Sequence, residues 1–245
     1  MTGSFLINEL SWLDGLALCC FFIVLLFYGR VALMVGGGRS LNASMHQVRR
    51  AWMQRMIERP DRIVDAALTG HTVSSLSFFS SANIIIIAGL FGLLGKAEDA
   101  YRVIAAWPFV SPASAGLIQL KILGLIFVLA YGFFRFTWAL RQYNYCCALI
   151  GAAPFPRDKH PHAREIADQV AIVFTSALRS FGAGIRCYYF AIAWVSWVAG
   201  PLALLIATGA ITLMLLRRQT ISHSAQAIRR YIELNPPQET PPHGG

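Results

Sequence analysis

The stretch Cys187–Leu216, CYYFAIAWVSWVAGPLALLIATGAITLMLL, contains no charged side chain over 30 residues. Arg186 precedes it, and Arg217 and Arg218 follow it. About 20 apolar residues in a helix are enough to cross the ~30 Å hydrocarbon core of a bilayer. A second uncharged stretch, residues 72–95, contains four consecutive isoleucines. The sequence therefore predicts an integral membrane protein.

The composition supports this prediction and argues against a nucleic-acid partner. The chain has 245 residues, of which 56% are hydrophobic and 13% are charged, and this is too apolar for an ordinary soluble domain. The net charge is +9, but the basic residues flank apolar segments instead of forming a soluble basic face. We expect one helical membrane domain over residues 1–234 and a disordered, proline-containing tail over residues 235–245.

The long uncharged stretch can be read as one span or as two. As a single helix, its 30 residues would extend about 45 Å, which requires a marked tilt. A turn at Gly200-Pro201 would instead give two short spans. The spans expected in the second case are residues 13–35, 73–94, 115–140, 184–199 and 201–216.

The distribution of Lys and Arg favours five spans. Residues 1–11 carry no basic side chain, whereas the first and third connections and the C-terminal tail are rich in arginine. Cytoplasmic segments of membrane proteins carry an excess of Lys and Arg. With five spans, every strongly basic segment lies in the cytoplasm. The expected topology therefore has the N-terminus outside and the C-terminus inside a bacterial inner membrane.

An amphipathic helix is expected in the first basic connection. Met45, Val48, Trp52 and Met56 recur at spacings of three and four residues, and most of the arginines fall off that stripe. Such a helix can lie on the anionic lipids of the inner leaflet, or it can pack against the membrane domain of its own chain. The sequence leaves both alternatives open, and Pro60 predicts a break after this helix.

The second span begins with a face of small polar residues. Ser74, Ser77 and Ser81 share one side of the predicted helix, and Asn83 follows them. Small and hydroxylated side chains allow helices to approach closely in lipid and to form hydrogen bonds. The same face could instead line a water path, although we favour packing.

Ionisable residues gather near the inner membrane boundary. Such residues at membrane depth are candidates for function or for structural ion pairs. Asp65 and Asp168 could pair with the arginines there, or the arginines could form an anion-binding vestibule. We expect Lys121 to extend outward from the start of the third span. The candidate cluster consists of Asp65, Arg135, Arg141, Asn144, Asp168, Arg179 and Arg186.

Catalytic motifs are not recognisable. Gly36-Gly37-Gly38 lacks the Lys-Ser/Thr of a phosphate-binding loop, and no serine lies in a Gly-x-Ser-x-Gly context. His160 and His162 fit a solvated loop better than a metal site. We therefore expect a protein that is not an enzyme and that needs no cofactor or metal.

Three sequence blocks resemble an uncharacterised membrane-protein family, the domain of unknown function number 599, which occurs in bacteria and plants. These blocks are residues 77–84 (SFFSSANI), residues 134–145 (FRFTWALRQYNY) and residues 186–190 (RCYYF). The surroundings of Trp52, Asp65 and Arg217 are similar as well. The resemblance implies a membrane location and a helical fold, and it implies no catalytic activity.

Two classes of function fit these observations. The first is a non-enzymatic membrane protein that assembles with itself or regulates a partner through its small-residue faces. The second is a small carrier or channel for an anion, which would use the inner arginine cluster. The modest number of spans and the absence of charge in the middle of the spans favour assembly.

Overall fold

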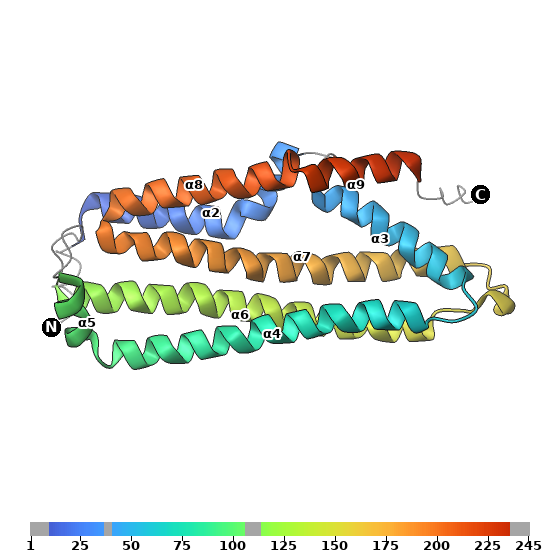
Figure 1. Ribbon diagram of the computed structural model, residues 1–245, viewed down its shortest axis with the longest axis horizontal. Helices are drawn as coiled ribbons and strands as arrows, with labels where there is room; N and C mark the ends of the chain where they lie inside the picture. Colours follow the sequence, from blue (N-terminus) through green and yellow to red (C-terminus); the bar gives the residue numbers. More distant parts are fainter. Residues whose placement is uncertain (1–9, 37–40, 106–113, 236–245) are drawn as a thin grey trace. The chain divides into compact units, whose positions relative to one another are not determined.

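The fold is all-α, as the sequence predicts. The computed structural model describes residues 10–36, 41–105 and 114–235, and these ranges form helices joined by short turns (Figure 1). In chain order the elements are α2 (Trp12–Gly36), α3 (Leu41–Glu58), α4 (Ile63–Leu94), α5 (Ala97–Ala105), α6 (Ala115–Ala152), η2 (Pro156–Asp158), α7 (Ala163–Val195), η3 (Ser196–Ala199), α8 (Pro201–Thr220) and α9 (His223–Leu234).

Residues 236–245 of the expected disordered tail lie outside the described ranges, and so do Gly37 and Gly38 of the glycine run.

Five of the described helical segments are long and apolar enough to cross a membrane. They begin at Trp12, Ile63, Ala115, Ala163 and Pro201. The segments that begin at Ala115 and Ala163 have a mean hydropathy of 2.1 and 1.3 in their most apolar windows, and 44% of each window is buried. In the segment that begins at Ile63 only 11% is buried. Most of the α4 surface is therefore free to face lipid or another protein.

Helices α4, α6 and α7 are longer than the spans predicted from the sequence. Helix α4 has 32 residues, α6 has 38 and α7 has 33. We expected the third span to end near Leu140 because Arg141 follows, but α6 continues to Ala152. This extension buries Tyr143, Cys146 and Ile150 in an apolar cluster. A charged residue such as Arg141 can therefore follow the apolar part of a helix without ending the helix.

The turn at Gly200 divides the long apolar stretch into two helices. Gly200 has φ 119°, a backbone conformation that side-chain-bearing residues rarely adopt. Pro201 begins α8, where its missing N–H costs no helical hydrogen bond and its fixed φ suits the first turn. The Gly-Pro pair therefore provides both the reversal of the chain and the start of the next helix.

The chain divides into two compact units, each built from several segments. Unit 1 comprises Met1–Val31, Ser80–Phe134 and Ala183–Leu216, and unit 2 comprises Ala32–Phe79, Arg135–Gly182 and Arg217–Gly245. The helices α4, α6 and α7 each contribute one part to unit 1 and one part to unit 2.

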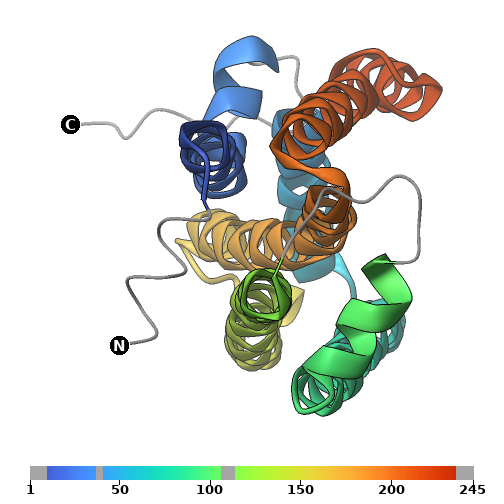
Figure 2. The ribbon, with the colours of Figure 1, turned by 90° about the vertical axis from the view of Figure 1, so that its left-hand side faces the viewer.

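Unit 1 is built around the C-terminal part of α7 (Figure 2). Phe21 of α2 packs edge-on against Phe190 and Trp194 of α7, with ring centroids 5.9 Å and 5.0 Å apart. On another side of α7, Gly124 of α6 allows close approach, because a Cβ there would lie 2.0 Å from Cζ2 of Trp194. Aromatic packing and one glycine thus set the helix contacts of this unit.

Unit 2 has an apolar core formed by α3, α4, α6 and α7. Met53, Met56, Leu76, Tyr143 and Phe174 are almost completely buried in it. Helix α3 therefore packs its apolar stripe against its own chain, which is the second of the two alternatives left open by the sequence. Pro60 separates α3 from α4, as expected for a residue that cannot continue a helix after Arg59.

Candidate functional site

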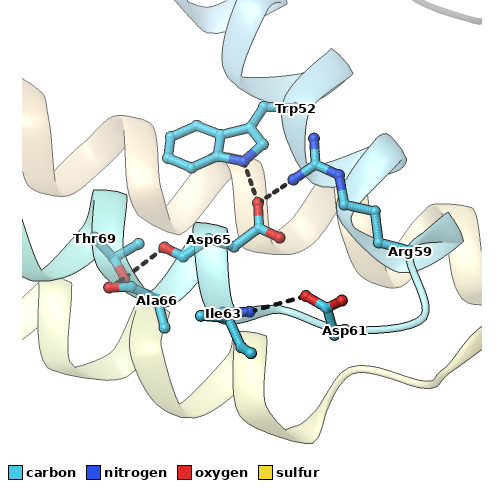
Figure 3. A network of polar contacts seen from close by, with 7 residues as sticks. All are labelled: Trp52, Arg59, Asp61, Ile63, Asp65, Ala66 and Thr69. Carbon is cyan, nitrogen blue, oxygen red and sulfur yellow. Dashed lines mark hydrogen bonds and ion pairs between the residues drawn. The ribbon is translucent and has the colours of Figure 1, made fainter.

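Asp65 is the centre of a buried polar network in unit 2 (Figure 3). It lies in the first turn of α4, and its side chain is fully buried. Its Oδ1 atom accepts hydrogen bonds from Nε1 of Trp52 at 2.5 Å and from Nη1 of Arg59 at 2.7 Å. Its Oδ2 atom is buried and has no hydrogen-bond partner among the described residues. A charged, hydrogen-bonded carboxylate therefore connects α3 to the start of α4.

Asp168 forms a second network, which connects α7 to α3. Arg50 donates to both of its carboxylate oxygens, from Nε to Oδ1 at 2.8 Å and from Nη2 to Oδ2 at 2.6 Å. Nε2 of Gln54 also donates to Oδ1, at 2.9 Å. The bidentate contact with Asp168 is the main reason why the pKa of Arg50 is raised.

The two acids are thus held by arginines that the sequence analysis did not select. We expected some of the arginines Arg135, Arg141, Arg179 and Arg186 as their partners, but the ion pairs of these acids among the described residues are Arg59–Asp65 and Arg50–Asp168. Arg141 is exposed, and the buried Nε of Arg135 has no hydrogen-bond partner among the described residues. Arg50 meets Asp168 because α3 contacts α7, whereas Arg59 meets Asp65 across the short connection between α3 and α4.

The remaining members of the predicted cluster, Asn144, Arg179 and Arg186, do not all belong to the same unit. Asn144 and Arg179 are exposed residues of unit 2. Arg186 belongs to unit 1, where its guanidinium carbon lies 5.1 Å from the ring centroid of Tyr28. Six of the seven residues of the predicted cluster therefore fall in the sequence ranges of unit 2, and Arg186 falls in unit 1.

A positively charged patch lies along the contact of α3 with α7. Arg49 is half-buried, and its pKa is lowered to about 10, first by burial and then by the nearby charge of Arg179. Nδ1 of His46 lies 3.1 Å from Oγ1 of Thr175. Burial, Arg179, Arg49 and Arg50 all lower the pKa of His46, and Asp168 opposes them. Arg49, Arg50, Arg179 and Asp168 therefore all lie near enough to His46 to shift its pKa, and the positive charges among them outnumber the negative one.

Arg62 fastens the connection between α3 and α4 to the end of α6. Its guanidinium donates to the carbonyl oxygens of Ile150 and Pro154, at 2.5 Å and 2.7 Å. Its guanidinium carbon lies 4.3 Å from the ring centroid of Phe155. A cation is favourable at this end of a helix, where carbonyl groups lack helical partners.

The serine face of α4 is exposed within a single chain. Ser74, Ser77 and Ser81 are all exposed, and Oγ of Ser74 donates to the carbonyl of Gly70 in its own helix. Asn83 points to a different side of α4, where Nδ2 donates to the carbonyl of Leu129 at 2.8 Å. The serines therefore do not pack against a helix of the same chain, and Asn83 is not part of their face.

Unit 1 contains a buried polar network that was not predicted from the sequence. We expected Lys121 to extend outward, but it is buried, and its Nζ donates to the carbonyl of Trp197 at 2.8 Å. Nε1 of Trp197 in turn donates to Oδ1 of Asp14 at 2.7 Å, and Nε1 of Trp194 donates to the carbonyl of Lys121 at 2.7 Å. The Trp197 carbonyl also accepts the backbone N–H of Gly200 at 2.9 Å, and Pro201, four residues after Trp197, has no N–H to donate to it. In the sequence, the feature that could have indicated this network is the position of Trp194 and Trp197 just before Gly200-Pro201.

The described residues define an all-α membrane protein with five helices long and apolar enough to cross a bilayer. The ion pairs of Asp65 and Asp168 belong to unit 2. The chain belongs to the family described as "Protein of unknown function, DUF599", whose model matches residues 16–224. This confirms the resemblance found in the sequence. No curated protein and no solved structure matches the chain significantly.

Proposed function

We propose that this chain is a non-enzymatic protein of the bacterial inner membrane that assembles with itself through α4. The observation that carries the proposal is the exposed face of small residues on α4, the least buried of the apolar helices. At 100° per residue, five small residues fall on one side of the helix. They are Ser74, Ser77, Ser81, Ala88 and Gly92, and all are exposed.

A face of this kind suits contact between two copies of a helix in lipid. Helix association in membranes depends on close van der Waals packing, which small side chains permit, and on hydrogen bonds from serine. A Cβ at Gly92 would meet no atom of the chain within 4 Å, so this glycine is not needed for packing within one copy. In a self-associated form, Gly92 would allow two copies of α4 to approach closely.

The charge distribution supports a cytoplasmic location for the unit 2 residues. Sixteen of the 21 lysines and arginines fall in the sequence ranges of unit 2, against eight of the 12 acidic residues. The positive-inside rule then places the N-terminus outside and the C-terminus in the cytoplasm. Anionic lipids of the inner leaflet are the expected neighbours of this basic unit.

Leucine substitutions on the serine face test the assembly. Ser77→Leu and Ser81→Leu add volume to an exposed face, so a single copy should keep its thermal stability in detergent. Self-association should fall by roughly tenfold, because overpacking of a helix contact costs about 1–3 kcal/mol. Chemical crosslinking and sedimentation in mild detergent measure the association.

Ile86→Phe is the matched control. Ile86 is exposed on α4, and it lies roughly 140° around the helix from Ser81. This variant adds volume on the opposite side and should associate like the original chain. The proposal fails if the serine variants associate normally, or if the Ile86 variant loses association to the same extent.

The cationic patch of α3 and α7 favours a second candidate, a small carrier or channel for an anion. Arg49 and Arg179 lie close enough for their charges to interact, and Asp168 is already engaged by Arg50. If the patch handles anions, Arg49→Gln in reconstituted vesicles should abolish a flux of chloride or phosphate that the original chain supports. Absence of flux in the original chain would eliminate this candidate.

A further inference from the structure

A cavity of about 310 Å³ opens beside the Asp65 network. All of its walls belong to unit 2, and they come from α3, from the start of α4 and from α9. Such a volume lies in the range of small-molecule sites. Neither the Asp65 network nor self-association through α4 accounts for this cavity.

The walls of the cavity combine arginine side chains with apolar ones. Arg55 and Arg59 supply the cationic part, and Val64, Leu68 and Tyr231 supply an apolar part. Val64, Leu68 and Tyr231 are 60%, 52% and 47% exposed, so their apolar surface is open to a ligand in the cavity. A soluble ion would use only the arginines, so the lining suits an amphiphile with an anionic head.

Arg55 is the cation available to such a ligand. Arg59 is already paired with Asp65, whereas the side-chain contact of Arg55 is with a neutral group, from Nη2 to Oδ1 of Asn235 at 2.5 Å. A guanidinium has five N–H donors, so Arg55 keeps donors for a phosphate. The acid in the lining, Asp61, accepts from the backbone N–H of Ile63 at 3.4 Å and so acts at the start of α4.

The position of the apolar wall along α4 fits the headgroup layer of a bilayer. If the hydrocarbon core begins near Val73, a rise of 1.5 Å per residue places Leu68 about 7 Å and Val64 about 13 Å beyond its edge. Headgroups extend roughly 5–8 Å on each side of the core. Leu68 therefore lies at headgroup depth and Val64 just beyond it, near the basic side chains that can reach a phosphate.

We propose that this cavity binds an anionic phospholipid of the surrounding membrane. The lipid phosphate would contact Arg55, with support from Arg59, and the glycerol backbone of the lipid would cover Leu68. This inference rests on the membrane placement proposed above and specifies one binding site for the anionic lipids expected there. It does not depend on self-association through α4.

Lipid binding to the full chain in detergent tests the site. Phosphatidylglycerol should raise the midpoint of thermal unfolding and remain bound in native mass spectrometry, whereas phosphatidylcholine should do neither. Arg55→Gln should weaken phosphatidylglycerol binding roughly tenfold, because a charge-assisted hydrogen bond contributes about 1.5–3 kcal/mol. Leu68→Gln should weaken it as well, because it removes the apolar wall.

Arg164→Gln is the matched control. Arg164 is an exposed arginine of unit 2 outside the cavity lining, so this variant removes the same charge without touching the site. It should bind phosphatidylglycerol like the original chain. An unchanged melting midpoint of each variant without lipid shows that it is folded. If Arg55→Gln lowers the melting midpoint without lipid, Arg55→Lys replaces it. That variant keeps the charge and should retain most of the binding.

Three results would overturn the proposal. They are normal lipid binding by Arg55→Gln, an equal loss in Arg164→Gln, and binding of glycerol phosphate as tight as that of phosphatidylglycerol. The last result would indicate a site for a soluble anion. Because crosslinking of the serine variants reports association and mass spectrometry reports lipid, failure of one proposal is distinguishable from failure of the other.

Discussion

At the residue scale, two carboxylates contact α3 in unit 2, that of Asp65 fully buried and that of Asp168 partly buried. Asp65 is fully buried and accepts from Trp52 and Arg59, and Asp168 is held by Arg50 and Gln54. A buried charge is costly unless it is paired and hydrogen-bonded. These contacts therefore matter more as a condition for packing α3 correctly than as a net source of stability.

Removal of the Asp65 carboxylate should destabilise the fold. Asp65→Ala leaves Nε1 of Trp52 without its acceptor and Arg59 without its ion-pair partner, at a cost of about 2–3 kcal/mol. Asp158→Asn is the control, because the Arg157–Asp158 pair is mostly exposed and should change stability by less than about 0.5 kcal/mol. Thermal unfolding in detergent measures both. Equal midpoints for the two variants would contradict this role for Asp65.

An exchange of charges should identify the partner of Asp168. The double variant Arg50→Asp with Asp168→Arg should recover part of the stability that either single variant loses, because the two side chains form a bidentate pair. Arg141→Asp combined with Asp168→Arg should recover none. Recovery with Arg141 would restore the pairing that the sequence suggested.

His46 should make the stability of the chain depend on pH. Its pKa is lowered in the folded state, mainly by burial, so the unfolded chain binds a proton more readily. This contribution is fully present above the unfolded pKa of about 6.5, and it is lost as the pH falls below that value toward the folded pKa. The midpoint temperature of unfolding should decrease when the pH is lowered from 7.5 to 5.5. The decrease should be smaller in His46→Gln. Parallel profiles of the two proteins would show that other groups cause the decrease.

At the scale of elements, close helix contacts depend on particular glycines. Gly124 of α6 lies directly against the indole of Trp194 in α7, and a Cβ at Gly132 would lie 2.9 Å from Cβ of Cys187. Both contacts are in unit 1. Without a large hydrophobic driving force between helices in lipid, this fit determines which helices become neighbours.

Alanine substitutions should distinguish these glycines from others in the same unit. Gly124→Ala should destabilise the chain by about 3 kcal/mol or more, because the new Cβ would overlap the Trp194 ring and the core is already packed. Gly209→Ala in α8 should be neutral or slightly stabilising, because nothing lies within 4 Å of its Cβ position. Thermal unfolding compares them. A Gly124 variant as stable as the Gly209 variant would rule out the close contact.

At the scale of the whole molecule, the division at Gly200 decides which side of the membrane the C-terminal helix occupies. With α8 as a separate span, Arg217 and Arg218 follow a fifth crossing. Basic residues are retained in the cytoplasm, so this count agrees with the charge distribution, whereas four spans would place the basic tail outside.

Single cysteines should report this topology in a chain without the five native ones. Ile221→Cys should resist a membrane-impermeant thiol reagent in intact cells and react after permeabilisation, because Ile221 is 63% exposed and follows α8. Trp12→Cys, 74% exposed at the start of α2, should react in intact cells. Labelling of Ile221→Cys from outside would restore the four-span topology.

The sequence by itself was enough to predict the membrane environment and the helical secondary structure. Uncharged stretches of this length indicate a bilayer because a chain of 245 residues has no soluble core large enough to bury several of them, and Gly200-Pro201 indicated a break from local backbone geometry alone. The similarity to the family also followed from local blocks. The tertiary structure alone decided which charges meet. Arg50 reaches Asp168, and Lys121 turns inward to a carbonyl, because helices distant in sequence pack side by side. Those contacts depend on long-range packing, which leaves no periodic signal along the chain.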